Sequence, residues 1–362
     1  MDSTDSLHVE LGRRSYEIVI GSGYLAETAT FLRRHVTITH AVIITDDNVE
    51  TPHAVSVAES LADEDTAVDL MVVEAGEQSK SVAMAERLWD QMLGANADRK
   101  TVVIAVGGGV IGDLAGFVAA TYARGLTYVQ IPTTLLAQVD SGVGGKVAIN
   151  LPRAKNMVGA FWQPAIVLID TRALSTLPRR EYLAGLGEVV KYGVIRDAAF
   201  FAFLEGHVEQ ILARDDTVLK RVIARCCQLK AEVVQADERE ESGLRAILNY
   251  GHTFAHALEA ATCYEQFLHG EAVSIGMLCA SRLAESLGMV PPEFTARQRD
   301  LLAAFTLPVS LPSIDRRVFL EAMQTDKKVA HGRLRFVLPT ALGDVRLVDH
   351  VTTEQILAAL DE

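Results

Sequence analysis

The sequence is poor in cysteine and has no cysteine motif that would hold a structural metal ion. Its 362 residues include four cysteines, all in the second half, at positions 226, 227, 263 and 279. Two of them are adjacent and none forms a CxxC pair, which argues against a secreted disulfide framework and against the common structural zinc modules. We expect free, buried thiols in a reducing compartment.

Long apolar runs and an excess of positive charge are also missing. The most apolar stretch, residues 102–129, contains Asp113 and Arg124, and the acidic start of the chain differs from a signal peptide. A net charge of −13 argues against binding to nucleic acid or to anionic membranes. We expect a cytoplasmic protein that binds neither nucleic acid nor a membrane. If its substrate is anionic, positively charged side chains must be gathered at the binding site.

The hydrophobic pattern divides the chain near residue 178. Before it, residues 8–11 and 16–20 predict a hairpin, and short apolar runs at 41–45, 68–73, 101–106, 126–131 and 165–169 predict strands that alternate with helices. This alternation predicts an α/β domain over residues 1–178 with a mostly parallel, Rossmann-like sheet.

Residues 179–362 predict a mainly α-helical domain. Helical periodicity covers 180–195, 198–213, 217–236, 244–261, 271–287 and 292–304, followed by a strand pair at 333–338 and 345–348 and a helix from residue 353.

A glycine-rich loop follows the predicted strand 101–106. Gly107, Gly109 and Gly112 match G-x-G-x-x-G between a strand and a helix, the context in which backbone N–H groups bind a pyrophosphate. The loop does not follow the first strand, and no acidic residue ends a strand about 20 residues later. Asp46, at the end of an earlier strand, could bind the ribose instead. A tight structural turn is the alternative.

Histidines and a carboxylate on predicted helices suggest a metal site. His252 and His256 lie one helical turn apart, His269 opens another helix, and Glu188 lies on an apolar helix one turn before Lys191. Spacing alone favours His252 and His256 as the ligand pair. Histidines that pack in the core or cap a helix are the alternative. The lack of H-E-x-x-H argues against a protease.

Several motifs occur together in one order from about residue 46 to residue 328. They are GGGVIGD at 107–113, YARG at 122–125, PTTLLAQVDS at 132–141, GGK at 144–146, GAFWQP at 159–164, GEVVKYG at 187–193, ADERE at 236–240, LNYGH at 248–252 and DKK at 326–328. In these motifs the chain resembles the 3-dehydroquinate synthases. An extra residue near Glu240 is a small departure in a predicted loop.

The resemblance implies two cofactors, NAD and zinc or cobalt. It implies that Glu188, His252 and His269 bind the metal and that His256 lies on the substrate side, which differs from the ligand pair that spacing favours. For NAD it implies Asp46, Asn48, Glu77, Lys80, Gly108, Gly109, Val110, Asp113, Thr133, Thr134, Lys155 and Thr176. For the substrate it implies Arg124, Asp140, Lys146, Asn156, Lys191, Lys230, Arg245, Asn249, His256 and Lys328, with Lys327 the alternative to Lys328.

The implied reaction converts 3-deoxy-D-arabino-heptulosonate 7-phosphate to 3-dehydroquinate and phosphate, with NAD reduced and reoxidised in each turnover. Such an enzyme is a carbon–oxygen lyase of the shikimate pathway and is expected to be a homodimer. The alternatives are another sugar-phosphate cyclase, such as an inosose or valiolone synthase, a metal-dependent NAD polyol dehydrogenase, or a nucleotide-binding protein without activity. Lys230, Arg245, Asn249 and His256 together favour a substrate that carries a carboxylate.

Overall fold

The chain folds into two compact units in a computed structural model that describes residues 5–63, 65–325 and 334–360. The first unit comprises residues 1–178 and 219–239, and the second comprises 179–218 and 240–362. The first division therefore falls where the sequence pattern changes, at Pro178. The prediction of two continuous domains did not anticipate that residues 219–239 belong to the first unit.

A seven-stranded sheet forms the centre of the first unit, in the order β1-β2-β9-β6-β5-β3-β4. Its strands are β1 (Asp5–Val9), β2 (Tyr16–Gly21), β3 (His40–Asp46), β4 (Ala67–Val73), β5 (Val102–Gly107), β6 (Thr127–Pro132) and β9 (Ile166–Asp170). Only the β1–β2 hairpin is antiparallel, and every other neighbouring pair is parallel. The predicted hairpin and the mostly parallel sheet are both confirmed.

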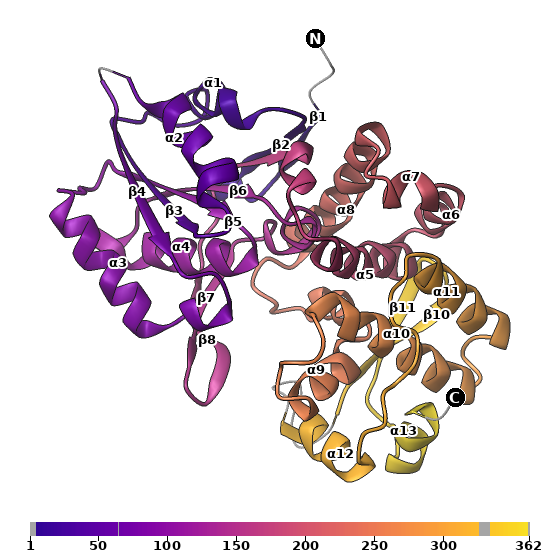
Figure 1. The fold of residues 1–362 in the computed structure, drawn as a ribbon. Helices are drawn as coiled ribbons and strands as arrows, with labels where there is room; N and C mark the ends of the chain where they lie inside the picture. Colours follow the sequence, from indigo (N-terminus) through magenta and orange to yellow (C-terminus); the bar gives the residue numbers. More distant parts are fainter. Residues whose placement is uncertain (1–4, 64, 326–333, 361–362) are drawn as a thin grey trace. The chain divides into compact units, whose positions relative to one another are not determined.

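Helices cover both faces of this sheet (Figure 1). Along β3, Val42 and Ile44 pack with α3 (Val82–Gly94) and α4 (Gly109–Thr121). Ala41 and Ile43 point to the opposite face, where α1 (Thr28–Leu32) and α2 (Val55–Leu61) pack. The alternation follows from the period of two residues in a strand. Because both faces are buried, the strand reads as a continuous apolar run.

The chain forms a second hairpin, not predicted from the sequence, after β6 and before β9. This hairpin consists of β7 (Lys146–Leu151) and β8 (Ala154–Phe161), which pair antiparallel outside the main sheet. Val147 and Ile149 are buried against α4, whereas most of β8 is exposed. One apolar face on a single strand is a weak sequence signal.

Helix α8 (Asp216–Ala236) contributes its residues from Leu219 onward to the first unit. The thiol of Cys227 donates to the carbonyl oxygen of Gln138 at 3.2 Å, and Lys230 Nζ donates to the carbonyl oxygen of Asp140 at 2.5 Å. These contacts explain why the segment packs with the sheet unit, although its helical pattern resembles that of its neighbours in sequence.

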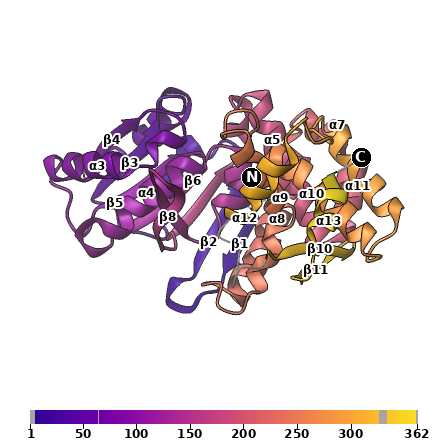
Figure 2. The ribbon, with the colours of Figure 1, turned by 90° about the horizontal axis from the view of Figure 1, so that it is seen from below.

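The second unit is mainly helical, as predicted (Figure 2). It contains α5 (Arg179–Arg196), α6 (Ala198–Gly206), α7 (Val208–Leu212), α9 (His252–Ala261), α10 (His269–Ser286), α11 (Pro292–Ala304), α12 (Arg316–Thr325), α13 (Thr353–Leu360) and the hairpin of β10 (Phe336–Ala341) and β11 (Asp344–Val348). The strand pair is confirmed, whereas α12 was not predicted. Among the described residues, no helix is long and apolar enough to span a membrane.

Two predicted helices are interrupted in the structure. The segment 198–213 divides into α6 and α7 at His207, and 244–261 divides into a 3-10 helix (Leu244–Asn249) and α9. Gly251 precedes α9 with a φ of +79°, a conformation that favours glycine. A Cβ atom there would lie 2.7 Å from Cγ of Met277, so the break also allows α9 to approach α10 closely.

Candidate functional site

In the first unit, the predicted cofactor residues follow strands that end at one edge of the sheet. Asp46 ends β3, Gly107 ends β5 and Thr133 follows β6, and these three strands are neighbours. Numbered by their order in the chain, the parallel strands β4-β3-β5-β6-β9 lie in the sheet in the order 2-1-3-4-5. The chain runs from β3 to β4 toward one edge of the sheet and from β5 onward toward the other, so the direction reverses between β3 and β5. In sheets of this type, ligands bind outside the carboxyl ends of the strands at that point.

The glycines after β5 have different structural roles. A Cβ atom at Gly107 would lie 2.6 Å from Cβ of Ile111, and one at Gly112 would lie 2.5 Å from Nε2 of Gln130. These two glycines therefore allow α4 to pack closely on the sheet. Gly108 and Gly109 are partly exposed at the start of α4, where unpaired backbone N–H groups and the helix dipole favour an anion.

Two buried hydroxyl groups beside this loop are suited to bind a ligand. Oγ1 of Thr133 and Oγ of Ser141 are buried and have no hydrogen-bond partner among the described residues. A Cβ atom at Gly109 would lie 3.0 Å from Oγ of Ser141, so this hydroxyl borders the loop. Buried polar groups without partners are uncommon in proteins. These residues therefore fit a dinucleotide phosphate.

A polar cluster joins three predicted cofactor residues, Glu77, Lys80 and Asp113, to one predicted substrate residue, Asn156. Nζ of Lys80, which is buried, lies 2.6 Å from both Oδ2 of Asp113 and Oδ1 of Asn156. Nδ2 of Asn150 donates to Oε1 of Glu77 at 2.8 Å, and Oδ1 of Asn150 accepts from the backbone N–H of Asn156 at 2.8 Å. Burial raises the pKa of Asp113, and the nearby ammonium group of Lys80 partly offsets this increase. Asn150 was not predicted as a site residue, because neither its spacing nor its type is distinctive.

Other predicted residues of the first unit have contacts of their own or are exposed. Oδ1 of Asp140 forms an ion pair with Nζ of Lys230 at 2.9 Å. Oδ1 of Asp46 accepts from the backbone N–H groups of Asn48 and Val49 at 3.0 and 3.1 Å, which shapes the turn after β3. Val110 and Thr134 are partly exposed at the sheet edge, and Lys146 and Lys155 are exposed on the β7–β8 hairpin.

The hydroxyl group of Thr176 forms a hydrogen bond with a histidine, His53, that was not predicted as a site residue. Its Oγ1 atom lies 2.7 Å from Nε2 of His53, a buried histidine near the start of α2. Burial lowers the pKa of His53, and Asp170 partly offsets this effect. The ring therefore favours its neutral form, and nothing in the apolar pattern around it distinguishes it from a core residue.

Arg124 is separated from the glycine loop. The glycine loop lies at the first residue of α4, and Arg124 follows the last residue of this helix. The 13 residues of α4 span about 20 Å, which separates the two. The side chain of Arg124 is exposed, and both Arg124 and Ala123 have a positive φ, at 72° and 47°. Such a conformation is strained for residues other than glycine.

In the second unit, three helices bring together Glu188, His252 and His269. The carboxylate of Glu188, on α5, is fully buried, and its Oε1 atom lies 3.4 Å from Nε2 of His252 and 3.6 Å from Nε2 of His269. Lys191, one turn further along α5, forms an ion pair with Oε2 of the same carboxylate. All three candidate ligand atoms lie within 4.8 Å of one another.

The approach of α5 to α10 depends on glycine. A Cβ atom at Gly270 would lie 1.7 Å from the carbonyl oxygen of Ala184, and one at Gly187 would lie 2.4 Å from the carbonyl oxygen of Gly270. These residues adjoin His269 and Glu188 in the chain. Close helix contact at this crossing therefore sets the distance between the carboxylate and the imidazole.

Both histidine rings are held at Nδ1. Nδ1 of His252 lies 3.1 Å from the carbonyl oxygen of Tyr250, and Nδ1 of His269 lies 3.2 Å from Oε1 of Glu259. An acceptor at Nδ1 favours the tautomer with its proton there, in which Nε2 carries the lone pair that can bind a metal. Glu259 was not predicted, although its position seven residues after His252 places it on the same face of α9.

The dimensions of this group fit a metal ion. Nitrogen and oxygen ligands lie about 2.0–2.2 Å from zinc, so two of them at a tetrahedral angle are about 3.4 Å apart. The distances of 3.4 and 3.6 Å from Glu188 agree with this value. His256, Glu259 and His269 form a second possible group. The orientation of Nε2 in His252 and His269 favours the first group.

The electrostatics of this group also favour a cation. Although burial lowers the pKa of His269, the carboxylates of Glu188 and Glu259 raise it to about 10. A divalent cation would be attracted by the same two carboxylates.

The remaining predicted residues of the second unit lie near one another in sequence. Arg245 is buried, with Nε 3.7 Å from Oε1 of Glu240, and Asn249 is partly exposed two residues before Gly251. The ring of His256 lies 5.5 Å from that of His252 and 6.2 Å from that of His269, measured between centroids. Lys328 and its alternative Lys327 lie outside the described residues.

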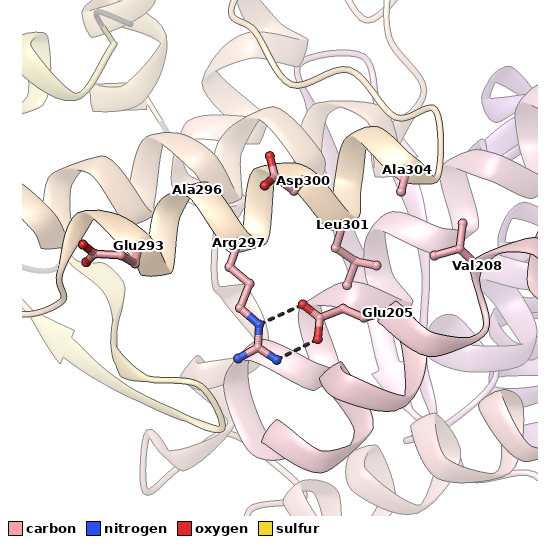
Figure 3. A pocket seen from close by; sticks show the side chains of 8 residues that line it. All are labelled: Glu205, Val208, Glu293, Ala296, Arg297, Asp300, Leu301 and Ala304. Carbon is pink, nitrogen blue, oxygen red and sulfur yellow. Dashed lines mark hydrogen bonds and ion pairs between the residues drawn. The ribbon is translucent and has the colours of Figure 1, made fainter.

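A separate cavity of about 440 Å³ between α6, α7 and α11 contains none of the predicted site residues (Figure 3). Arg297 forms a bidentate ion pair with Glu205 there, at 2.8 and 2.6 Å. The other polar residues that line it, Glu293 and Asp300, are both acidic. This cavity is poorly suited to an anionic substrate.

Comparison with known proteins identifies the family to which this chain is similar. Family models described as the 3-dehydroquinate synthase N-terminal and C-terminal regions match residues 70–184 and 185–329. The 3-dehydroquinate synthase of Rhodopirellula baltica is 48% identical over 362 residues, which cover 98% of this chain and 96% of the relative.

Two solved structures are similar over nearly the whole chain. One is the 2-epi-5-epi-valiolone synthase of Streptomyces hygroscopicus subsp. jinggangensis with NAD+ and Zn2+ bound, with 31% identity, a TM-score of 0.87 and coverage of 97% and 96% of the two chains. The other is a 2-deoxy-scyllo-inosose synthase complexed with carbaglucose-6-phosphate, NAD+ and Co2+, with 26% identity, a TM-score of 0.88 and coverage of 98% of each chain. The matched regions and the identity over the full length show that this chain belongs to the 3-dehydroquinate synthase family.

Proposed function

We propose that the protein is a 3-dehydroquinate synthase, a carbon–oxygen lyase that converts 3-deoxy-D-arabino-heptulosonate 7-phosphate to 3-dehydroquinate and phosphate. The observation that carries the proposal is the group of Glu188, His252 and His269, in a chain that also has a nucleotide-binding type of sheet edge. Family membership and 48% identity to a named 3-dehydroquinate synthase support it.

NAD would bind at the carboxyl edge of the sheet and, when bound, would accept a hydride from the substrate and return it. The N–H groups of Gly108, Gly109 and Val110 would bind its phosphates, together with Thr133 and Thr134. Asp46 and Asn48, at the end of the neighbouring strand, would bind a ribose. Glu77, Lys80, Asp113, Lys155 and Thr176 complete the proposed set.

Zinc or cobalt would be held by Glu188, His252 and His269 and, when bound, would polarise a substrate hydroxyl. The carbonyl of Tyr250 and the carboxylate of Glu259 keep the two imidazoles oriented. Lys191 balances the charge of Glu188 and would also contact substrate.

The remaining side chains would bind and orient the substrate. Positive groups suit its phosphate and carboxylate, since charge-assisted hydrogen bonds are stronger than neutral ones. The proposed set is Arg124, Asp140, Lys146, Asn156, Lys191, Lys230, Arg245, Asn249, His256 and Lys328. Lys230, Arg245, Asn249 and His256 would bind the carboxylate end, and His256 would also accept or donate a proton at an imidazole nitrogen.

The chemistry needs orientation more than a strong base. Oxidation of one carbinol acidifies the neighbouring C–H bond, so phosphate can leave by elimination. After re-reduction the ring opens and closes again by an intramolecular aldol reaction. Side chains that fix the substrate and exclude water contribute by proximity and by stabilising developing negative charge.

We also propose that the protein is a homodimer.

An assay with catalytic NAD tests this proposal. The metal-loaded protein, with NAD at a concentration far below that of the heptulosonate phosphate, should release phosphate and dehydroquinate over many turnovers. A glucose 6-phosphate or sedoheptulose 7-phosphate substrate that cyclises while the heptulosonate phosphate does not would indicate an inosose or valiolone synthase instead. Consumption of one NAD for each product would indicate a dehydrogenase.

A further inference from the structure

The turn before Lys146 is held by a polar network that belongs to no proposed binding site. Gly144 and Gly145 form this turn, with φ values of +100° and +61°. The backbone N–H of Gly144 donates to the hydroxyl of Tyr16 at 3.1 Å, and the carbonyl oxygen of Gly145 accepts from the backbone N–H of Trp162 at 2.7 Å. The position of Lys146 therefore depends on contacts from the β1–β2 hairpin and from the segment after β8.

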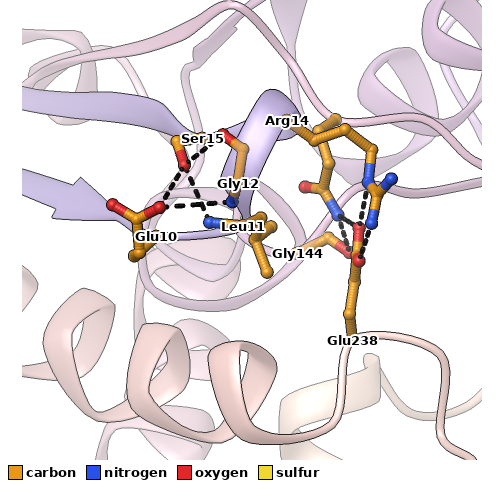
Figure 4. Close-up of polar contacts among 8 residues, drawn as sticks. Glu10, Leu11, Gly12, Arg14, Ser15, Gly144 and Glu238 are labelled. Carbon is orange, nitrogen blue, oxygen red and sulfur yellow. Dashed lines mark hydrogen bonds and ion pairs between the residues drawn. The ribbon is translucent and has the colours of Figure 1, made fainter.

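Glu238, just after α8, lies at the centre of this network. Its carboxylate accepts two hydrogen bonds from the guanidinium group of Arg14, at 3.0 and 2.6 Å, in the bidentate geometry that fixes both side chains (Figure 4). The side chain of Glu238 is only 13% exposed, whereas that of Arg14 is 50% exposed. The hydrogen bonds from Arg14 are the main cause that lowers the pKa of Glu238.

Gln163 connects Glu238 to the turn. Its Nε2 atom donates to Oε1 of Glu238 at 3.0 Å and lies 3.5 Å from the carbonyl oxygen of Gly144. A Cβ atom at Gly145 would lie 2.5 Å from the side chain of Gln163. The amide of Gln163 is thus packed directly on the turn, and Glu238 determines where that amide lies.

The end of α8 is fixed to the same hairpin by a second contact. The backbone N–H of Glu10 donates to Oε1 of Gln235 at 2.6 Å. Five residues earlier on this helix, Lys230 contacts Asp140. One segment therefore contacts Asp140 directly and reaches the Gly144 turn through Gln163.

We propose that Glu238 is a positioning residue, which holds Lys146 in place through Gln163 and the Gly144 turn without contacting substrate. This inference rests on the proposed function only for the role of Lys146. A displacement of about 1 Å in a group that stabilises a transition state can lower turnover about 100-fold. A change at Glu238 should therefore lower kcat and leave KM nearly unchanged.

The test compares Glu238→Gln with Glu205→Gln. The Glu205–Arg297 pair has the same bidentate geometry, at 2.8 and 2.6 Å, but lies in the cavity that contains no predicted site residue (Figure 3). Glu238→Gln should lower kcat about 10- to 100-fold, whereas Glu205→Gln should keep wild-type kcat. Arg14→Lys, which retains the charge, should keep more activity than Arg14→Met. Equal kcat values for Glu238→Gln and Glu205→Gln would overturn the proposal.

A spectroscopic measurement separates this inference from the proposed activity. The chain has two tryptophans, Trp89 and Trp162, so Trp89→Phe leaves only the indole next to the Gly145 turn. In that background, Glu238→Gln should change the near-UV circular dichroism of Trp162, and Glu205→Gln should not. An unchanged Trp162 signal would contradict the proposal even if the wild-type protein had a different activity. A wild-type protein without synthase activity, but with the changed signal, would contradict the proposed function alone.

Discussion

Oε1 of Glu259 lies 3.2 Å from Nδ1 of His269, whose Nε2 atom lies 3.6 Å from Glu188. One ring is therefore held between two carboxylates from different helices. Since carboxylate partners of metal-bound histidines orient the ring and raise its basicity, Glu259→Gln should weaken zinc binding by about 10- to 100-fold. Competition with a chromophoric chelator measures this affinity without an activity assay.

The control for this change is Glu265→Gln, which alters an exposed carboxylate just after α9. This variant should bind zinc as the wild type does. If Glu259→Gln retained wild-type zinc affinity, Glu259 would have no part in orienting His269. A loss of affinity in His256→Gln as large as in His269→Gln would favour the second possible ligand group.

The ion pair of Lys80 with Asp113 gives a second prediction. Lys80→Met leaves the Asp113 carboxylate without its partner in a largely buried place, so the free energy of unfolding should fall by up to about 3–5 kcal/mol. NAD affinity should fall as well, since both residues border the proposed cofactor site. Chemical denaturation and isothermal titration with NAD measure the two effects.

A double variant separates stability from binding. Lys80→Met with Asp113→Leu removes both charges and should recover part of the lost stability, because no unpaired charge remains. It should not recover NAD binding. Wild-type NAD affinity in the double variant would mean that this pair has only a structural role.

His53 predicts a pH dependence of stability. The ring has a pKa of about 6.5 in an unfolded chain, and burial lowers it in the folded protein. The unfolded state therefore binds more protons as the pH falls below about 6.5, so stability present above this pH is lost below it. His53→Gln should flatten the dependence of Tm on pH between about 7 and 5.

The exposed His350 provides the comparison for this measurement. His350→Gln should keep the slope of the wild type. If His53→Gln kept it too, protonation of His53 would not contribute to acid destabilisation.

The sequence predicted individual elements better than their boundaries and partners. The β3 and β5 runs were clear because both faces of a central parallel strand are buried. The helix predicted at 244–261 was too long, since apolar periodicity continues through Tyr250 although Gly251 adopts a positive φ. The β7–β8 hairpin was missed because only one of its strands is buried.

The residues of the proposed site show a similar division. Resemblance to a family nominated Glu188, His252 and His269, and the structure brings these three together. Spacing had favoured His252 with His256, because one helical turn is the only proximity that local sequence can indicate. Asn150, His53 and Glu259 were not predicted, since each acts through a partner that is distant in sequence or lies on an unremarkable helix face.

The sequence by itself determined the α/β half, the helical half, the glycine loop and the shortage of uncharged apolar runs. These depend on the periodicity and chemistry of neighbouring residues. The tertiary structure decided that residues 219–239 return to the sheet unit and that Nε2 of two histidines points to one buried carboxylate. The first depends on contacts such as those of Cys227 and Lys230 with Gln138 and Asp140, and the second on how closely helices pack, as at Gly187 and Gly270. Contacts of either kind leave no periodic pattern in the chain.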